Sequence, residues 1–191
     1  YCNEDIKDVY HELFDDALKR YNDKQTRKDR KIDDYYEKIR SGKQEKLFHE
    51  VILQIGDKDN MGSETMEGQL AAKILDEYMK GFQERNPTLR VFAAHLHLDE
   101  ATPHLHIDFI PYVTGSKRGL DTRVSLKQAL SSLGFKGGSR SETELNQWVQ
   151  SEKQKLAMVM RENEIEWDQK GTHEQHLSVL DYKKKVREQE V

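Results

Sequence analysis

The chain has 191 residues, of which 35% are hydrophobic and 35% are charged, and its formal net charge is -4 at pH 7. This length suits one domain with a modest core, with or without a helical appendage, and the high charge predicts much exposed helix surface. Because it has no apolar run of roughly 18 to 20 residues, no secretory signal and only one cysteine, we expect a soluble, cytoplasmic protein without membrane contacts or an internal disulfide.

The first half of the chain switches between helical and extended patterns. Apolar residues recur at helical spacing in two long stretches, whereas a β-branched stretch between them favours a strand. An amphipathic helix is expected at 6–21, with Asn3 as its cap, followed by a short helix at 33–40. A central strand at 48–55 and a loop at 56–62 come next. A second amphipathic helix begins at about Thr65 and stops at Asn86-Pro87.

Two further strands surround a dense histidine cluster, which holds four of the eight histidines. Side chains alternate along a strand, so His95 and His97 share one face of the first strand, opposite Phe92, Ala94, Leu96 and Leu98. In the second strand His104, His106 and Asp108 share a face, opposite Leu105, Ile107 and Phe109. With a turn at 99–103 the two strands form an antiparallel hairpin, which would project all four imidazoles from one face.

The C-terminal part is expected to be mainly helical. A short helix is predicted at 125–133, a glycine-rich stretch at 134–139 and a long helix at 142–163. A charged helix is expected after His176, so we divide the chain into a core at 1–170 and a helical tail at 171–191. The predicted fold class is α+β, with an antiparallel β-sheet flanked by long α-helices.

The histidine cluster predicts a site for one divalent cation. Three imidazoles on one surface of a hairpin leave coordination positions open for water or substrate, as in catalytic sites. Asp99 and Glu100, in the turn, are candidates to orient a ring N–H, to bind the cation or to act on a proton. Asp108 is a candidate hydrogen-bond partner for His106. His95 is farther from the turn than His97, so we expect it to support the ligands or to have a structural role rather than to bind the cation.

The stretch from His97 to His106 reads HLDEATPHLH and is followed by Pro111. This string resembles the third motif of the plasmid mobilisation and recombination relaxases, the Mob/Pre (MobV) family, within which HLH is the HUH signature of a wider nuclease superfamily. The likeness extends through 30–37, 51–57 and 117–120, and so covers most of the chain. The resemblance implies a protein that nicks one strand of plasmid DNA at a transfer origin and stays attached to the 5′ end.

Carried over by position, the resemblance implies that His97, His104 and His106 bind the metal, Mn2+ or Mg2+, and that Glu100 assists. Spacing alone would allow Zn2+ equally well. In this family the attacking residue lies upstream of the first long helix, so we expect the nucleophile to precede Tyr1, and residues 1–191 to bind metal and DNA but to cleave poorly. Tyr35, Tyr36 and Tyr112 are the tyrosines that would otherwise be candidates, although packing is the simpler role for each.

Basic residues cluster after the second histidine strand, in contrast to the negative net charge. Six lysines and arginines between 114 and 140 face one acid, Asp121, which is typical of a surface that contacts nucleic acid. The predicted contacts with origin DNA, either single-stranded or folded as a hairpin, are Lys117, Arg118, Arg123 and Lys127. A second basic run at 24–31 is left open as a DNA contact.

Two other functions remain open at this point. One is a metal-dependent phosphoesterase that hydrolyses nucleic acid with bound water, without a covalent intermediate. The other is a non-catalytic origin-binding module in which the metal is structural. A covalent DNA adduct would distinguish the relaxase from both.

Overall fold

The computed structural model describes residues 1–56, 66–98 and 102–163 in full, and the backbone strands 165–168, 177–179 and 181–184. The helices are α1 (Ile6–Asp23), α2 (Tyr35–Ser41), α3 (Met66–Lys80), α4 (Phe82–Arg85), α5 (Leu126–Ser132) and α6 (Glu144–Glu162), with a 3-10 turn at Lys28–Arg30. The strands are β1 (Cys2–Asn3), β2 (His49–Ile55), β3 (Leu89–His97), β4 (His104–Val113), β5 (Arg123–Val124), β6 (Ile165–Asp168), β7 (Leu177–Val179) and β8 (Asp181–Lys184).

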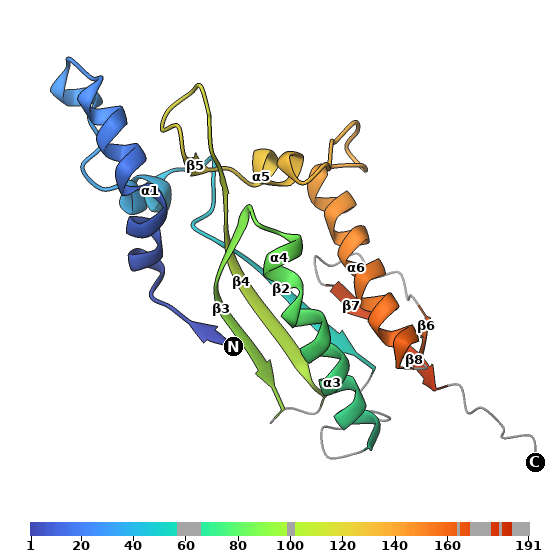
Figure 1. Cartoon of the computed structure of the whole chain (residues 1–191). Coiled ribbons are helices and arrows are strands. Elements are labelled where there is room, and N and C mark those ends of the chain that lie inside the picture. Colours follow the sequence, from blue (N-terminus) through green and yellow to red (C-terminus); the bar gives the residue numbers. More distant parts are fainter. Residues whose placement is uncertain (57–65, 99–101, 164, 169–176, 180, 185–191) are drawn as a thin grey trace, which may run out of the picture.

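The main sheet has the order β1-β3-β4-β2-β7, with β5 paired to the end of β4 (Figure 1). All of these pairings are antiparallel except that of β2 with β7. This confirms the predicted α+β class and the central place of the strand at 48–55, which lies between β4 and β7. Among the described residues, no helix has the length and apolar character needed to cross a membrane.

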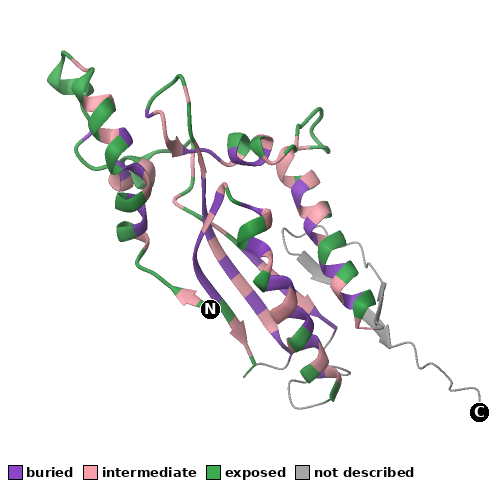
Figure 2. Cartoon of the chain, viewed as in Figure 1, coloured by how far each residue is buried: buried purple, intermediate pink, exposed green. Residues whose placement is uncertain are grey.

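The two faces of the sheet carry two separate hydrophobic clusters. On one face, apolar residues of β2, β3 and β4 pack against α3, α4, α5 and α6, around the fully buried Trp148. On the other face, α1 and α2 cover only one end of the sheet, where they pack against Phe92, Ile110 and Val124. The opposite end of this second face therefore has no helix over it among the described elements, and this is where the histidines lie (Figures 1 and 2).

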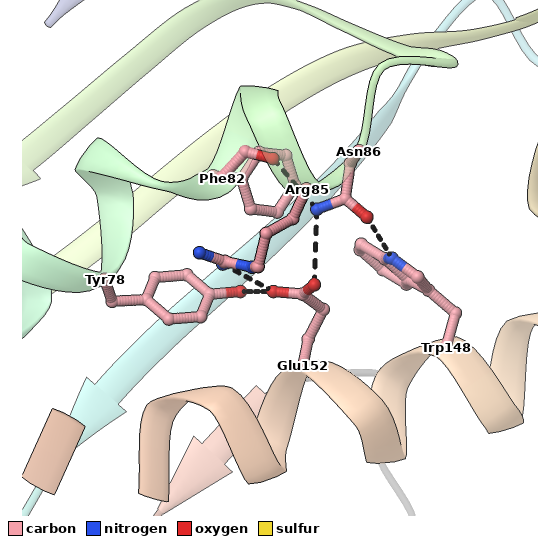
Figure 3. A network of polar contacts seen from close by, with 6 residues as sticks. All are labelled: Tyr78, Phe82, Arg85, Asn86, Trp148 and Glu152. Atoms are coloured by element: carbon pink, nitrogen blue, oxygen red, sulfur yellow. Dashed lines mark hydrogen bonds and ion pairs between the residues drawn. The ribbon is translucent and has the colours of Figure 1, made fainter. Parts of the chain in front are cut away.

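A buried polar network fastens α6 to α3 and α4 (Figure 3). The Glu152 carboxylate, 3% exposed, accepts hydrogen bonds from the Tyr78 hydroxyl at 2.5 Å, the Arg85 guanidinium at 2.9 Å and the Asn86 side-chain amide at 3.2 Å. Asn86 Oδ1 in turn accepts from the Trp148 ring at 2.9 Å. A charge this deeply buried is tolerated because each carboxylate oxygen accepts at least one hydrogen bond and the Arg85 charge lies beside it.

Helix boundaries differ from the sequence predictions in two instructive places. The cap of α1 is Asp5, whose carboxylate accepts from the amides of Lys7 and Asp8, whereas Asn3 is held in β1 opposite Ala93. The predicted helix that stops at Asn86 is broken at Gly81 into α3 and α4. In both cases a backbone constraint, pairing to β3 or a glycine, outweighs the periodic pattern.

The predicted faces of β3 are wrong at Phe92 and at Leu98. A β-bulge places an extra residue between Val91 and Ala93, so Phe92 packs in the second cluster while Ala94 packs in the first. A bulge reverses the alternation on one strand only, and the single-strand pattern does not reveal it. Leu98 lies beyond the end of β3 and is 51% exposed.

The helix expected after His176 is also wrong for the residues that the structure describes there. Residues 177–179 form β7, which pairs with β2 through Leu53 and Leu177, and residues 181–184 form β8, which pairs with β6. The backbone groups along the open edge of β2 require partners, and β7 supplies them. This part of the chain thus joins the sheets of the core.

Candidate functional site

The β3–β4 hairpin sets the four imidazoles on one face of the sheet, as predicted. In the register of the two strands, His97 is opposite His104 and His95 is opposite His106. Directly opposed residues of an antiparallel pair point to the same side, so the four rings form a patch at the uncovered end of the second face. The alternation along β4, with Leu105, Ile107 and Phe109 buried, is visible as bands in Figure 2.

The rings of His97 and His106 are the closest pair. Their centroids lie 4.7 Å apart, compared with 6.4 Å between His104 and His106 and 6.2 Å between His95 and His97. His95 is exposed, whereas the other three rings are partly buried. His97, His104 and His106 thus lie closer against the sheet than His95, which lies at the edge of the patch.

The predicted carboxylates of the turn, Asp99 and Glu100, lie outside the described residues. Within the part of the chain that is described, no three histidine, cysteine, aspartate or glutamate side chains are close enough to hold a metal ion as they stand. The donor set nevertheless suits a divalent cation, because neutral imidazoles are common ligands of transition metals.

His104 is held by polar partners at both ring nitrogens. Nδ1–H donates to the carbonyl of Thr102 at 2.6 Å, and Nε2 lies 2.9 Å from Oε1 of Gln54. The amide of Gln54 cannot simply be turned over, because its Nε2 donates to the carbonyl of Gly56 at 3.1 Å. With the proton on Nδ1, the lone pair of Nε2 is directed toward the side-chain oxygen of Gln54.

A pair of carboxyl groups lies beside His106. Glu50 and Asp108 are opposite one another in the β2–β4 register, and Glu50 Oε2 is 3.4 Å from Nδ1 of His106. Burial, followed by the hydrogen bond and the charge of Glu50, raises the pKa of Asp108 to about 7. The carboxylate next to His106 is thus Glu50, while Asp108, the predicted partner, lies opposite Glu50 in the register of the strands.

Sequence reasoning missed three residues of β2, two of which face the patch. Glu50 and Gln54 occupy alternate positions in an otherwise apolar strand, and this alternation was the available signal. His49 lies on the opposite, apolar face, where its ring stacks on Phe109 with centroids 6.1 Å apart. Desolvation, and then the nearby Lys46 charge, lower the pKa of His49 to about 4, so this ring is neutral at pH 7.

The predicted DNA-contacting residues lie at the far end of β4 from the imidazoles. Arg123 is opposite Val113, and nine residues of antiparallel strand separate Val113 from His104, which corresponds to about 30 Å. Lys117 and Arg118 are exposed in the loop between β4 and β5, while Lys127 is exposed on α5 with Glu144 Oε1 at 4.0 Å. Proximity in sequence to the histidine strand therefore does not place these cations beside it.

The tyrosines considered as nucleophiles have structural contacts away from the patch. Tyr35 is buried, its ring packs against Phe14 with centroids 4.9 Å apart, and its hydroxyl accepts from the amide of Val124. Tyr36 packs edge-on against Tyr10. Tyr112, at the far end of β4, donates to the carbonyl of Pro87 at 3.2 Å.

Comparison with known proteins gives one match. The model of the family described as "Plasmid recombination enzyme" (Mob_Pre) matches residues 1–184, which is nearly the whole chain. No curated protein and no solved structure matches the chain.

Proposed function

Since the chain belongs to the plasmid recombination enzyme family, we propose that it is a relaxase, which nicks one strand of plasmid DNA at a transfer origin by metal-assisted transesterification. His97, His104 and His106 would hold a divalent cation, Mn2+ or Mg2+, with assistance from Glu100. When bound, the cation would supply Lewis-acid polarisation of the scissile phosphate. The attacking group would form a bond to phosphorus as the bond to the 3′ oxygen breaks, leaving a free 3′ hydroxyl.

The observation that carries this proposal is the environment of His104. Thr102 fixes the proton on Nδ1, so the lone pair of Nε2 points out of the ring toward Gln54 Oε1, 2.9 Å away. Metal-binding histidines are commonly oriented by such a carbonyl at the other nitrogen. The side-chain oxygen of Gln54, which lies beside this nitrogen, would be a further oxygen ligand for the cation.

Glu50 and Asp108 support the proposal by orienting His106. A carboxylate next to Nδ1 favours the tautomer with its proton on that nitrogen and leaves Nε2 free to bind a metal. Because burial and then the neighbouring Glu50 raise the pKa of Asp108 to about 7, this carboxyl group adds less negative charge to the patch than an ordinary aspartate would. Their role is to position the ring, with no direct contact with DNA.

The attacking residue is not assigned among the tyrosines, whose hydroxyls or rings are engaged elsewhere. The register of β1 orients the N-terminal strand relative to the imidazoles. Cys2 is opposite Ala94 in an antiparallel pair, so the direction from Cys2 toward Tyr1 runs along β3 toward His97.

The proposal is tested by incubating the full-length protein with supercoiled plasmid that carries its origin, in the presence of Mn2+. We expect nicked circles and a protein–DNA adduct that survives denaturant and migrates with the 5′ end. His104→Ala and His106→Ala should abolish both products, whereas His11→Ala, on the exposed surface of α1, should leave them unchanged.

Other results would point to the alternative functions. Metal-dependent nicking without any adduct would favour hydrolysis by bound water. Unchanged DNA processing in His104→Ala, together with lost metal binding, would favour a structural metal in an origin-binding module.

A further inference from the structure

A basic groove lies between α2 and the loop that joins β4 to β5, at the end of the sheet opposite the imidazoles. Its volume is about 970 Å³, and its lining includes four cationic side chains, Lys38, Lys43, Arg118 and Arg123, and one acidic side chain, Glu45. Lys38 belongs to α2 and Lys43 follows it directly, whereas Arg118 and Arg123 come from residues about 80 positions later. The fold thus assembles a positive surface that neither stretch of sequence forms alone.

The charges of this groove are available to a ligand. Among the described residues, no carboxylate forms an ion pair with Lys38, Lys43 or Arg118. Asp121, the single acid of the adjacent basic run, is held outside the groove by Arg20 through two contacts of 2.8 Å. Asp121 is therefore neutralised by a cation outside the groove, and the four cationic side chains of the lining exceed its one acid, Glu45.

The floor of the groove is rigid. It is formed by Tyr35, Ile32, Leu120 and Val124, all members of the cluster that packs on the second face of the sheet. The Tyr35 hydroxyl accepts from the amide of Val124 at 3.0 Å, which ties α2 to β5 across the groove. The cationic side chains thus extend from a fixed support, which reduces the entropy lost when a ligand binds.

The groove and the imidazoles lie on the same side of the sheet. Ile110, which packs in the cluster beneath the groove, has the same strand parity as His104 and His106 on β4. The separation along β4 is about 25 to 30 Å, which corresponds to about eight base pairs of duplex at 3.4 Å each. One DNA molecule can therefore reach both places without crossing the sheet.

We propose that this groove binds the phosphate backbone of DNA about eight base pairs from the imidazole patch, so that the two sites hold one DNA molecule at two points. The inference rests on the proposed function for the identity of the ligand as DNA. It adds Lys38 and Lys43 to the predicted contacts Arg118 and Arg123. Lys127 is not part of this surface, because α5 packs on the other face of the sheet.

The test compares two double variants that change the net charge equally. Lys38→Glu/Lys43→Glu alters the groove, and Lys153→Glu/Lys155→Glu alters α6, in the layer on the opposite face. The probe is a fluorescein-labelled 30-base-pair duplex of arbitrary sequence, titrated by anisotropy at several salt concentrations. Phosphate contacts do not depend on sequence, so the natural origin is not required.

We expect the groove variant to bind about tenfold more weakly at 50 mM salt, with a slope of log K against log salt that is smaller by about 1.8, for two lost phosphate contacts. The α6 variant should change affinity by less than threefold. A photo-crosslinker at Ser41, which lines the groove, should also attach to the duplex in the wild-type protein.

Equal weakening in both double variants, or unchanged binding in the groove variant, would overturn the proposal. Binding of poly-glutamate with the same affinity as the duplex would overturn the assignment to nucleic acid. These results are separable from the plasmid assay. If His104→Ala abolishes nicking but the groove variant binds DNA as the wild type does, the proposed function stands and the groove proposal fails. If His104→Ala leaves nicking intact but the groove variant binds DNA more weakly, the groove proposal stands and the proposed function fails.

Discussion

At the scale of single residues, the strand β2 carries opposite chemistry on its two faces. Glu50 and Gln54 face the imidazole patch, whereas His49 is packed on the apolar face against Phe109. The same residue type therefore has two roles in this sheet. On one face an imidazole is presented to solvent and polar partners, and on the other it serves as a neutral ring in a hydrophobic contact.

His49 gives the protein a defined sensitivity to acid. Its pKa is about 4 in the folded protein, compared with 6.5 for an ordinary histidine, so the unfolded chain takes up a proton first as the pH falls. The contribution of the neutral His49 ring to stability is therefore fully present above pH 6.5, and it is lost as the pH falls from 6.5 to 4. We expect the free energy of unfolding to lose about 2 kcal/mol over this window, after allowance for partial exposure.

His49→Phe should remove the decrease in unfolding free energy that His49 causes between pH 6.5 and pH 4, as measured by urea unfolding at both pH values. The control is His11→Asn, because His11 is exposed beside Asp15 and its pKa is raised by that hydrogen bond. The His11 variant should retain the acid loss. If the His49→Phe variant loses as much stability as the wild type, the ring of His49 is not kept neutral by its surroundings.

At the scale of elements, the join between α6 and the α3–α4 pair depends on one carboxylate. Glu152 accepts from Tyr78, Arg85 and Asn86, and burial together with the neighbouring Glu152 charge raises the pKa of Tyr78 above its usual range. Glu152→Ala would leave the Arg85 charge and two donors without their acceptor. We expect a loss of about 3 to 5 kcal/mol in unfolding free energy.

The matched control for this prediction is Glu162→Ala, at the exposed end of the same helix, which should change stability by less than about 0.5 kcal/mol. Chemical denaturation followed by circular dichroism gives both values. A cost below about 1 kcal/mol for Glu152→Ala would mean that the network can be replaced by water without loss.

At the scale of the whole molecule, metal binding should be linked to stability. A ligand that binds only the folded protein stabilises it by about 2.7 kcal/mol at one hundred times its dissociation constant. For a chain of this length, this corresponds to a rise of roughly 5 to 10 °C in Tm. We therefore expect Mn2+ to raise the Tm and EDTA to reverse the effect.

His104→Ala should eliminate the Mn2+-dependent rise, and Gln54→Ala should weaken Mn2+ binding about tenfold, as measured by calorimetry. His11→Ala serves as the control and should keep the full rise. An identical rise in His104→Ala would exclude the imidazole patch as the metal site, whatever the activity of the protein.

The sequence alone determined the hairpin and its chemistry. Strict alternation in 104–109 identifies the buried and the polar face of β4, and the short connection at 99–103 brings both histidine pairs to one side. These features depend on neighbours in sequence. For the same reason, the α5 cap at Ser125 and the strand at 48–55 follow from local pattern.

Only the tertiary structure decided which distant residues complete each surface. The β2–β4 register aligns Gln54 with His104 and Glu50 with Asp108, and the packing of α2 against β5 brings Lys38 and Lys43 to Arg118. The β-bulge at 91–93 and the distance of about 30 Å between the basic loop and the histidines are likewise consequences of strand pairing. Local periodicity fixes the face of a side chain, but the partner across that face is fixed by contacts between segments that are far apart in the chain.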